Sequence, residues 1–137
     1  MTGSLNHHEA LVYVMVTVSA VDRAMTDAEL ARIGEIVSHL PIFTDYDQDG
    51  LVKTAESCGN ILSADGGLEQ VLHLVHEALP PKLHETAYAV ALEVAAADHA
   101  VTPEETRFLE MLGEELALDK LTIAAIERGI RARNMLP

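Results

Sequence analysis

The chain of 137 residues is 49% hydrophobic, which is too apolar for a disordered protein, and its length suits one domain with a buried core. Only 4% of the residues are aromatic and tryptophan is absent, so we expect a core of small aliphatic side chains between closely packed helices. Nine basic and 22 acidic residues give a formal net charge of −13, which argues against binding to nucleic acid.

The first predicted element lies in an apolar stretch of eleven residues, Leu11 to Val21. Because roughly 20 apolar residues are needed to cross a bilayer, this stretch is too short to insert into a membrane. The residues before it, 6–9, lack the basic flank of a signal peptide. We therefore expect a cytoplasmic location.

Two segments of the chain, about 9–40 and 85–116, match each other at an offset of 76 residues. Such a match indicates a duplicated unit, here two helix–turn–helix units. It also decides between strand and helix for residues 12–18, whose alternating β-branched pattern suggests a strand when taken alone. Their counterparts, within residues 87–97, are rich in alanine and favour a helix, so we predict helices in both units. The matching residues are Glu9, Asp22, Ala24, Thr26 and Glu29 in the first unit, and Glu85, Asp98, Ala100, Thr102 and Glu105 in the second.

The second helix of each unit begins at a predicted capping box. Thr26 and Thr102 are each followed three residues later by a glutamate, so each threonine hydroxyl is expected to accept from the glutamate amide while the carboxylate accepts from the threonine amide. Pro103 takes the first helical position, where its missing N–H costs nothing. The two helices then keep apolar residues at helical spacing as far as Leu40 and Leu116.

Three further helices complete the prediction. They run from Leu51 to Leu62, from Leu68 to Leu79 and from about Leu121 to Arg133. Residues 65–67 separate the first from the second, and Pro80 and Pro81 end the second. No linker or low-complexity segment divides the chain. The sequence therefore predicts an all-α bundle of about seven helices in a single domain over residues 1–137.

A helix that ends at an aspartate, a short turn with threonine, and a helix headed by glutamate occur twice in this chain. This arrangement resembles the TerB-like tellurite-resistance family, and the resemblance extends from about Glu9 to Arg133. It implies an all-helical cytoplasmic domain linked to stress and tellurite resistance, in which acidic residues hold a divalent metal. Carried onto this chain, those acids are Asp22, Glu29, Asp98 and Glu105.

The same four carboxylates form a candidate metal site by their own chemistry. Each aspartate ends one helix and each glutamate lies in the first turn of the next, so packing of the two units against each other would let them converge. Oxygen ligands suit Ca²⁺, Mg²⁺ or Mn²⁺, and a nitrogen from His99 would favour Zn²⁺ or Mn²⁺. The alternative is structural, because the glutamates also serve the capping boxes and the aspartates can bond turn amides.

A second candidate lies in residues 45–56, which match the EF-hand calcium loop at positions 1, 3, 5, 6 and 12. Its context is unfavourable, because Pro41 should break the helix that enters such a loop. The alternative is an Asp-rich connection in which Asp49, or an acid near it, caps the helix that starts at Leu51. The calcium ligands of this second choice would be Asp45, Asp47, Asp49, the Leu51 carbonyl and Glu56.

The remaining reactive side chains favour structural roles. His73 and His76 share one helix face, and we expect a structural role for both. Cys58 has no cationic neighbour in the sequence, and we expect it to be buried and inert. As the only cysteine it excludes a zinc site built from several thiolates.

No phosphate-binding loop, nucleophile elbow or zinc-protease motif occurs, so we predict no catalytic residues and no enzyme. The first hypothesis is a non-catalytic TerB-like module for stress and tellurite resistance that binds a divalent metal. The second is an acidic helical adaptor that docks an unidentified protein partner without metal. The third is a cryptic metal-dependent hydrolase. The sequence alone leaves the metal, the partner and the oligomeric state open.

Overall fold

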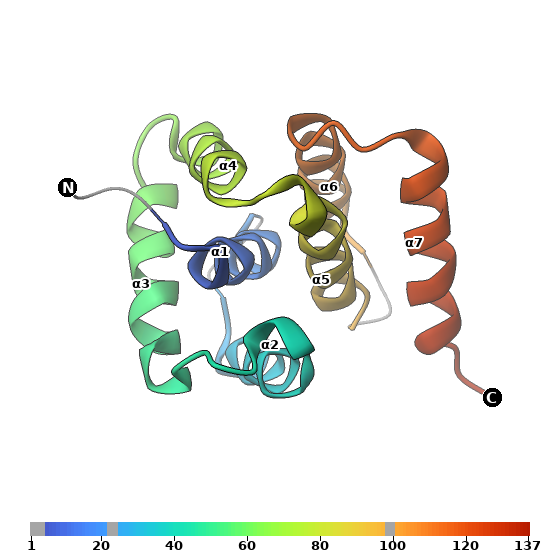
Figure 1. The fold of residues 1–137 in the computed structure, drawn as a ribbon, viewed down its shortest axis with the longest axis horizontal. Helices are drawn as coiled ribbons and strands as arrows, with labels where there is room; N and C mark the ends of the chain where they lie inside the picture. The colour runs from blue at the N-terminus through green and yellow to red at the C-terminus, as the bar shows by residue number, and fades with distance from the viewer. Residues whose placement is uncertain (1–4, 22–24, 98–100) are drawn as a thin grey trace.

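The computed structural model describes residues 5–21, 25–97 and 101–137. These residues form seven α-helices and three short 3₁₀ helices, which confirms the predicted all-α fold (Figure 1). Within them no helix is long and apolar enough to cross a membrane. The helices are α1 (His7–Ala20), α2 (Asp27–His39), η1 (Pro41–Phe43), η2 (Gln48–Gly50), α3 (Leu51–Leu62), α4 (Gly67–Ala78), η3 (Pro81–Leu83), α5 (His84–Ala96), α6 (Pro103–Glu115) and α7 (Lys120–Arg133).

Helix α1 lies at the centre of the bundle, with α2, α3, α4 and α5 around it (Figure 1). Its ten residues from Ala10 to Ser19 are all buried, including the polar Thr17 and Ser19. A helix that is surrounded on every side needs no polar face. Its sequence therefore lacks the alternation of apolar and polar residues, with a period of 3.6 residues, that is typical of a surface helix. This explains why residues 12–18 carry a strand-like pattern and yet form a helix.

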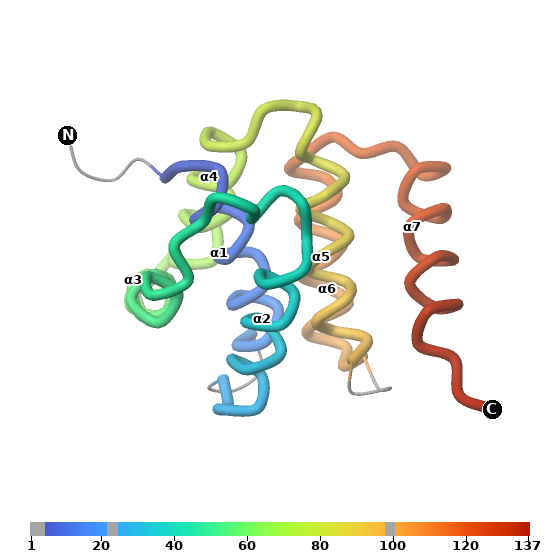
Figure 2. Tube along the Cα trace, turned by 60° about the horizontal axis from the view of Figure 1, so that its bottom comes forward, coloured from blue at the N-terminus to red at the C-terminus, as the bar shows by residue number. Residues whose placement is uncertain are grey.

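The two helix–turn–helix units lie side by side and point the same way. Helices α1 and α5 make the most extensive contact of any two described helices. Figure 2 shows both running in the same direction, with the ends of α1 and α5 and the starts of α2 and α6 at the same side of the molecule. The end of the first helix and the start of the second helix in each unit therefore lie at one end of the bundle.

The turn between α3 and α4 depends on two glycines. Gly66 has φ of +71°, a left-handed conformation that glycine adopts without steric cost. Gly67 begins α4 so close to the end of α3 that a Cβ atom there would lie 2.0 Å from the Ile61 carbonyl oxygen. The predicted break at residues 65–67 is thus a tight helix–helix connection, and α4 begins one residue earlier than expected.

The start of α3 corrects the capping role that the sequence offered as the alternative for Asp49 or an acid near it. Asp49 does not cap this helix, because the 3₁₀ turn η2 runs directly into it and Gly50 stands at the N-cap without a side-chain hydrogen bond. The Leu51 amide donates to the Gln48 carbonyl instead. Asp47 caps the preceding turn, where its Oδ1 accepts from the Asp49 amide at 3.0 Å.

Helix α7 stands at the edge of the molecule and packs mainly on α5 (Figures 1 and 2). None of its residues is buried, and only one side of it, with Ile123 and Ile126, packs against the core. Asp119 caps its start by accepting from the Thr122 amide at 2.7 Å, and this bond lowers the pKa of Asp119. The chain reaches this helix through Ala117, which has φ of +56°.

Candidate functional site

The two predicted capping boxes are present at the starts of α2 and α6. The Thr26 amide donates to Glu29 Oε1 at 2.8 Å, and the Glu29 amide donates to Thr26 Oγ1 at 3.1 Å. In the second unit the Thr102 amide donates to Glu105 Oε1 at 3.0 Å, and the Glu105 amide donates to Thr102 Oγ1 at 3.1 Å. The structural role that the sequence assigns to both glutamates is therefore confirmed.

Both glutamates lie in the first turn of their helices, on the side that faces the core. Glu105 is only 4% exposed, and the residues three, four and seven positions after it, Phe108, Leu109 and Leu112, are core residues. Glu29 is half-buried and stands in line with the buried Ile33 on α2. A buried carboxylate requires strong polar or cationic partners, and the Thr102 amide is one partner of Glu105.

The aspartates of this candidate site lie outside the described residues. Asp22 and Asp98 fall in the stretches 22–24 and 98–100, as does His99. The structure describes only Glu29 and Glu105 of the four carboxylates, so the four-carboxylate site stays a prediction.

The acids of the EF-hand-like loop are spread along an irregular connection. Helix α2 ends at His39 and Pro41 opens the turn η1, so the loop has no continuous entering helix, as the position of Pro41 predicts. Leu51 and Glu56 already belong to α3. Asp45 is 89% exposed, with Oδ1 3.6 Å from His8 Nε2. Among the described residues, which include this whole loop, no three His, Cys, Asp or Glu side chains gather as metal ligands would.

Sequence spacing missed two histidine contacts that join distant elements. His8 Nε2 lies 2.7 Å from the Ile42 carbonyl oxygen, and the His8 ring stacks on Phe43 at 5.5 Å between centroids. His76 Nδ1 lies 3.0 Å from Glu115 Oε2, which links α4 to α6. The partners in each contact are 34 or more residues apart in the chain, so no local pattern could have revealed them.

Cys58 is fully buried between α3 and α1, as predicted. Its Sγ lies 3.5 Å from Thr17 Oγ1 and 3.7 Å from the Tyr13 carbonyl oxygen. Burial raises the pKa of the thiol to about 11, although the hydrogen bond with Thr17 opposes this rise. A thiol that is both inaccessible and protonated is a poor nucleophile and a poor metal ligand.

We expect Cys58 to resist thiol reagents and to make the protein less stable at high pH. Native protein at pH 8 should react with a chromogenic disulfide at least about 100-fold more slowly than unfolded protein, because only the exposed thiolate attacks. Below pH 9, which is the ordinary pKa of a thiol, Cys58 is protonated in both the folded and the unfolded protein. Between pH 9 and about 11 the unfolded chain loses it first, so the free energy of unfolding should fall by up to about 2–3 kcal/mol.

Denaturant titrations of the wild type and a Cys58→Ala variant across this pH range isolate the contribution of Cys58. Tyr13, Tyr46 and Tyr88, whose pKa values burial raises, are present in both proteins, and only Tyr13 also feels the charge of Cys58. An equal decline in both proteins, or rapid labelling of the native wild type, would contradict the assignment.

Comparison with known proteins identifies a family for most of the chain. A sequence model of the family described as tellurite resistance protein TerB matches residues 8–128, which include both helix–turn–helix units. This match confirms the resemblance to the TerB-like family. Neither the curated proteins nor the solved structures give a significant match. The chain therefore belongs to the tellurite resistance protein TerB family and is an all-α module associated with tellurite resistance.

Proposed function

We propose that this module acts without catalysis and binds a divalent metal ion through the carboxylates of its two repeat turns. The ligands would be Asp22 and Glu29 from the first unit and Asp98 and Glu105 from the second. Bound there, the metal would supply positive charge between two turns that are otherwise acidic, and would tie the first unit to the second.

The burial of Glu105 is the observation that carries the proposal. Glu105 is 4% exposed as a residue and lies at the start of the core-facing side of α6, where it also completes the capping box. Glu29 occupies the equivalent place on α2, and α1 and α5 run in the same direction (Figure 2). Duplicated carboxylates at one end of the bundle are what an oxygen-ligated cation site requires.

The capping role is chemically compatible with metal binding. The bond from each threonine amide goes to one oxygen, Oε1, and an ionised carboxylate has about four lone-pair sites. A donor set of carboxylates favours Ca²⁺, Mg²⁺ or Mn²⁺ over softer metals. Zn²⁺ would require a nitrogen ligand, for which His99 is the candidate in the sequence.

Calorimetric titration of chelator-stripped protein with Ca²⁺, Mn²⁺, Mg²⁺ and Zn²⁺ tests the proposal. We expect one of these ions to bind with a Kd on the order of 10 μM or tighter. Glu105→Gln should weaken binding by at least about 10-fold, because it removes the charge while the amide oxygen still completes the capping box. Asp98→Asn should weaken binding to a similar extent.

Glu104→Gln is the matched control, because Glu104 lies in the same first turn of α6 but is exposed. Its affinity should stay within about 2-fold of the wild type, since an exposed charge is screened by water and salt. Asp47→Asn reports on the EF-hand-like loop in the same assay. Loss of binding in Asp47→Asn alone would move the metal to that loop. If no ion binds at millimolar concentration, metal binding is wrong and the adaptor hypothesis replaces it.

A further inference from the structure

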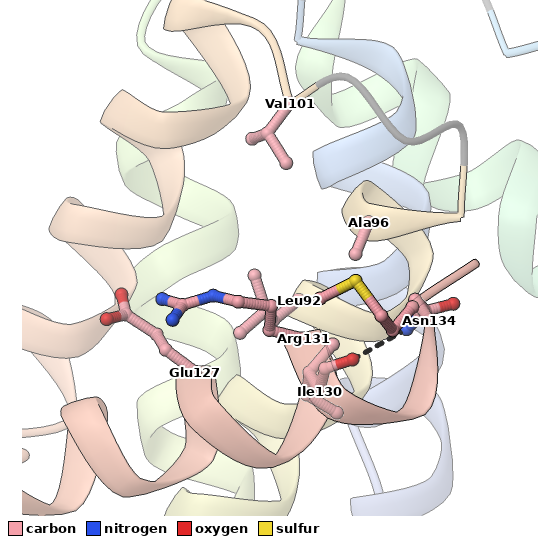
Figure 3. A pocket seen from close by; sticks show the side chains of 8 residues that line it. Leu92, Ala96, Val101, Glu127, Ile130, Arg131 and Asn134 are labelled. Atoms are coloured by element: carbon pink, nitrogen blue, oxygen red, sulfur yellow. Dashed lines mark hydrogen bonds between the residues drawn. The ribbon is translucent and has the colours of Figure 1, made fainter. Parts of the chain in front are cut away.

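The outer helix α7 leaves a groove open beside it. The groove has a volume of about 460 Å³ and lies between α5, the residue before the Thr102 cap, and the C-terminal half of α7 (Figure 3). Its apolar lining consists of Leu92, Ala96, Val101, Ile130 and Met135.

The groove coincides with much of the exposed apolar surface of the described residues. Val101 is 41% exposed and Met135 is 68% exposed, and Leu136 next to it is 67% exposed. Large aliphatic side chains at such exposure are scattered singly on most surfaces, whereas here Val101 and Met135 line one groove and Leu136 follows Met135 in the chain. A gathered apolar patch of this kind favours a binding surface.

The last two turns of α7, which form one wall of the groove, are locally basic. Residues 127–133 carry three arginines and one glutamate in a chain whose formal net charge is −13. Arg131 lines the groove together with Glu127, whereas Arg133 lies 3.4 Å from Glu93 of α5 in an ion pair. Arg128 and Arg131 are exposed and form no ion pair with any described residue. They therefore remain available to a partner.

We propose that this groove binds an acidic amphipathic segment of a partner protein. An aliphatic side chain of the segment occupies the space between Leu92, Ala96 and Ile130. Carboxylates next to it pair with the guanidinium groups of Arg131 and Arg128, which offer several donors in a planar fork. The apolar lining supplies affinity and the arginines select acidic sequences.

A peptide segment fits these charges better than a second copy or a membrane. A short segment meets only the local positive charge, because ionic screening limits its repulsion by the acidic body to about 8–10 Å. A second copy would bring together two bodies of formal charge −13, and an extended anionic membrane would face much of that negative charge. A groove of this size predicts a moderate Kd, on the order of 1–100 μM.

Selection from a random peptide library displayed on phage tests the proposal, with the chelator-treated full chain as bait so that the result is independent of metal. Peptides of about 16 residues span ~24 Å as a helix, enough to cover the C-terminal half of α7. We expect the enriched sequences to combine aliphatic with acidic residues. Their synthetic forms, measured by fluorescence anisotropy, should bind more weakly as salt increases.

Two variants of the groove and two matched controls locate the binding. Arg131→Glu and Met135→Asp change exposed side chains and should weaken peptide binding by at least about 10-fold. Lys53→Glu and Val52→Asp make the same kinds of change on the exposed side of α3, and affinity should stay within about 2-fold. Equal affinity in Arg131→Glu, or enrichment of peptides without acidic residues, would overturn the proposal.

The two competing occupants have their own readouts. A dimer in light scattering that Met135→Asp converts to a monomer would assign the groove to a second copy. Flotation of the protein with vesicles of phosphatidylcholine and phosphatidylserine, lost in Arg131→Glu, would assign it to an anionic membrane. Either result would replace the peptide segment as the occupant.

Discussion

Replacing Gly67 by alanine should destabilise the protein by about 3 kcal/mol. The new Cβ atom would lie 2.0 Å from the Ile61 carbonyl oxygen and 2.9 Å from the Leu62 Cα atom. Both are backbone atoms of α3, so no side-chain rotation can relieve the contact, and the α3–α4 connection must open. Chemical denaturation followed by circular dichroism measures the loss.

Gly59→Ala provides the control for this substitution. Gly59 lies within α3, and a Cβ atom there meets nothing within 4 Å. Because alanine favours a helix over glycine, this variant should gain about 0.5–1 kcal/mol. Opposite signs for the same chemical change would show that close backbone approach is what requires Gly67. A small loss in Gly67→Ala, similar in size to the gain in Gly59→Ala, would contradict the tight connection.

Replacing Phe108 by alanine should cost about 3–5 kcal/mol of the free energy of unfolding. Phe108 is 1% exposed and is the largest of the fully buried side chains. The alanine variant loses the transfer free energy of the ring and leaves a cavity under α6. For a domain of this size the thermal midpoint should fall on the order of 10–20 °C, as measured by calorimetry.

Leu121→Ala removes an aliphatic side chain of α7 that is 81% exposed. Its unfolding free energy should change by less than about 0.5 kcal/mol. Comparable losses in Leu121→Ala and Phe108→Ala would mean that α7 contributes to stability as a core helix does, contrary to its position at the edge of the bundle.

The helices could be predicted because their signals are local. The threonine–glutamate spacing at Thr26 and Thr102 specifies a capping box within four residues, and both boxes form. The sequence of α1 lacks the helical spacing of apolar residues, because this helix is buried on all sides. Its prediction as a helix therefore depended on the match with the second repeat unit. Its own cap, in which Asn6 and Glu9 form a third capping box, went unnoticed in the sequence.

The candidate site could be predicted only in part. Sequence spacing identified Glu29 and Glu105 but could not show that Glu105 is buried, since burial depends on how α6 packs. The error at Asp49 has a similar origin, because the 3₁₀ turn that replaces a side-chain cap has no strong sequence signal. The groove beside α7 is formed by residues from two distant helices and a turn, so spacing along the chain could not reveal it.

The central position of α1 has a consequence for how the protein is made. Its main packing partner, α5, begins 64 residues after α1 ends. At a synthesis rate of ~5–20 residues per second, the ribosome needs roughly 3–13 seconds to add that length. Throughout this interval the largely apolar helix α1 lacks α5, one of the neighbours that cover it in the folded protein. The nascent chain is therefore a substrate for chaperones that shield hydrophobic segments, and the native fold forms only after most of the chain has left the ribosome.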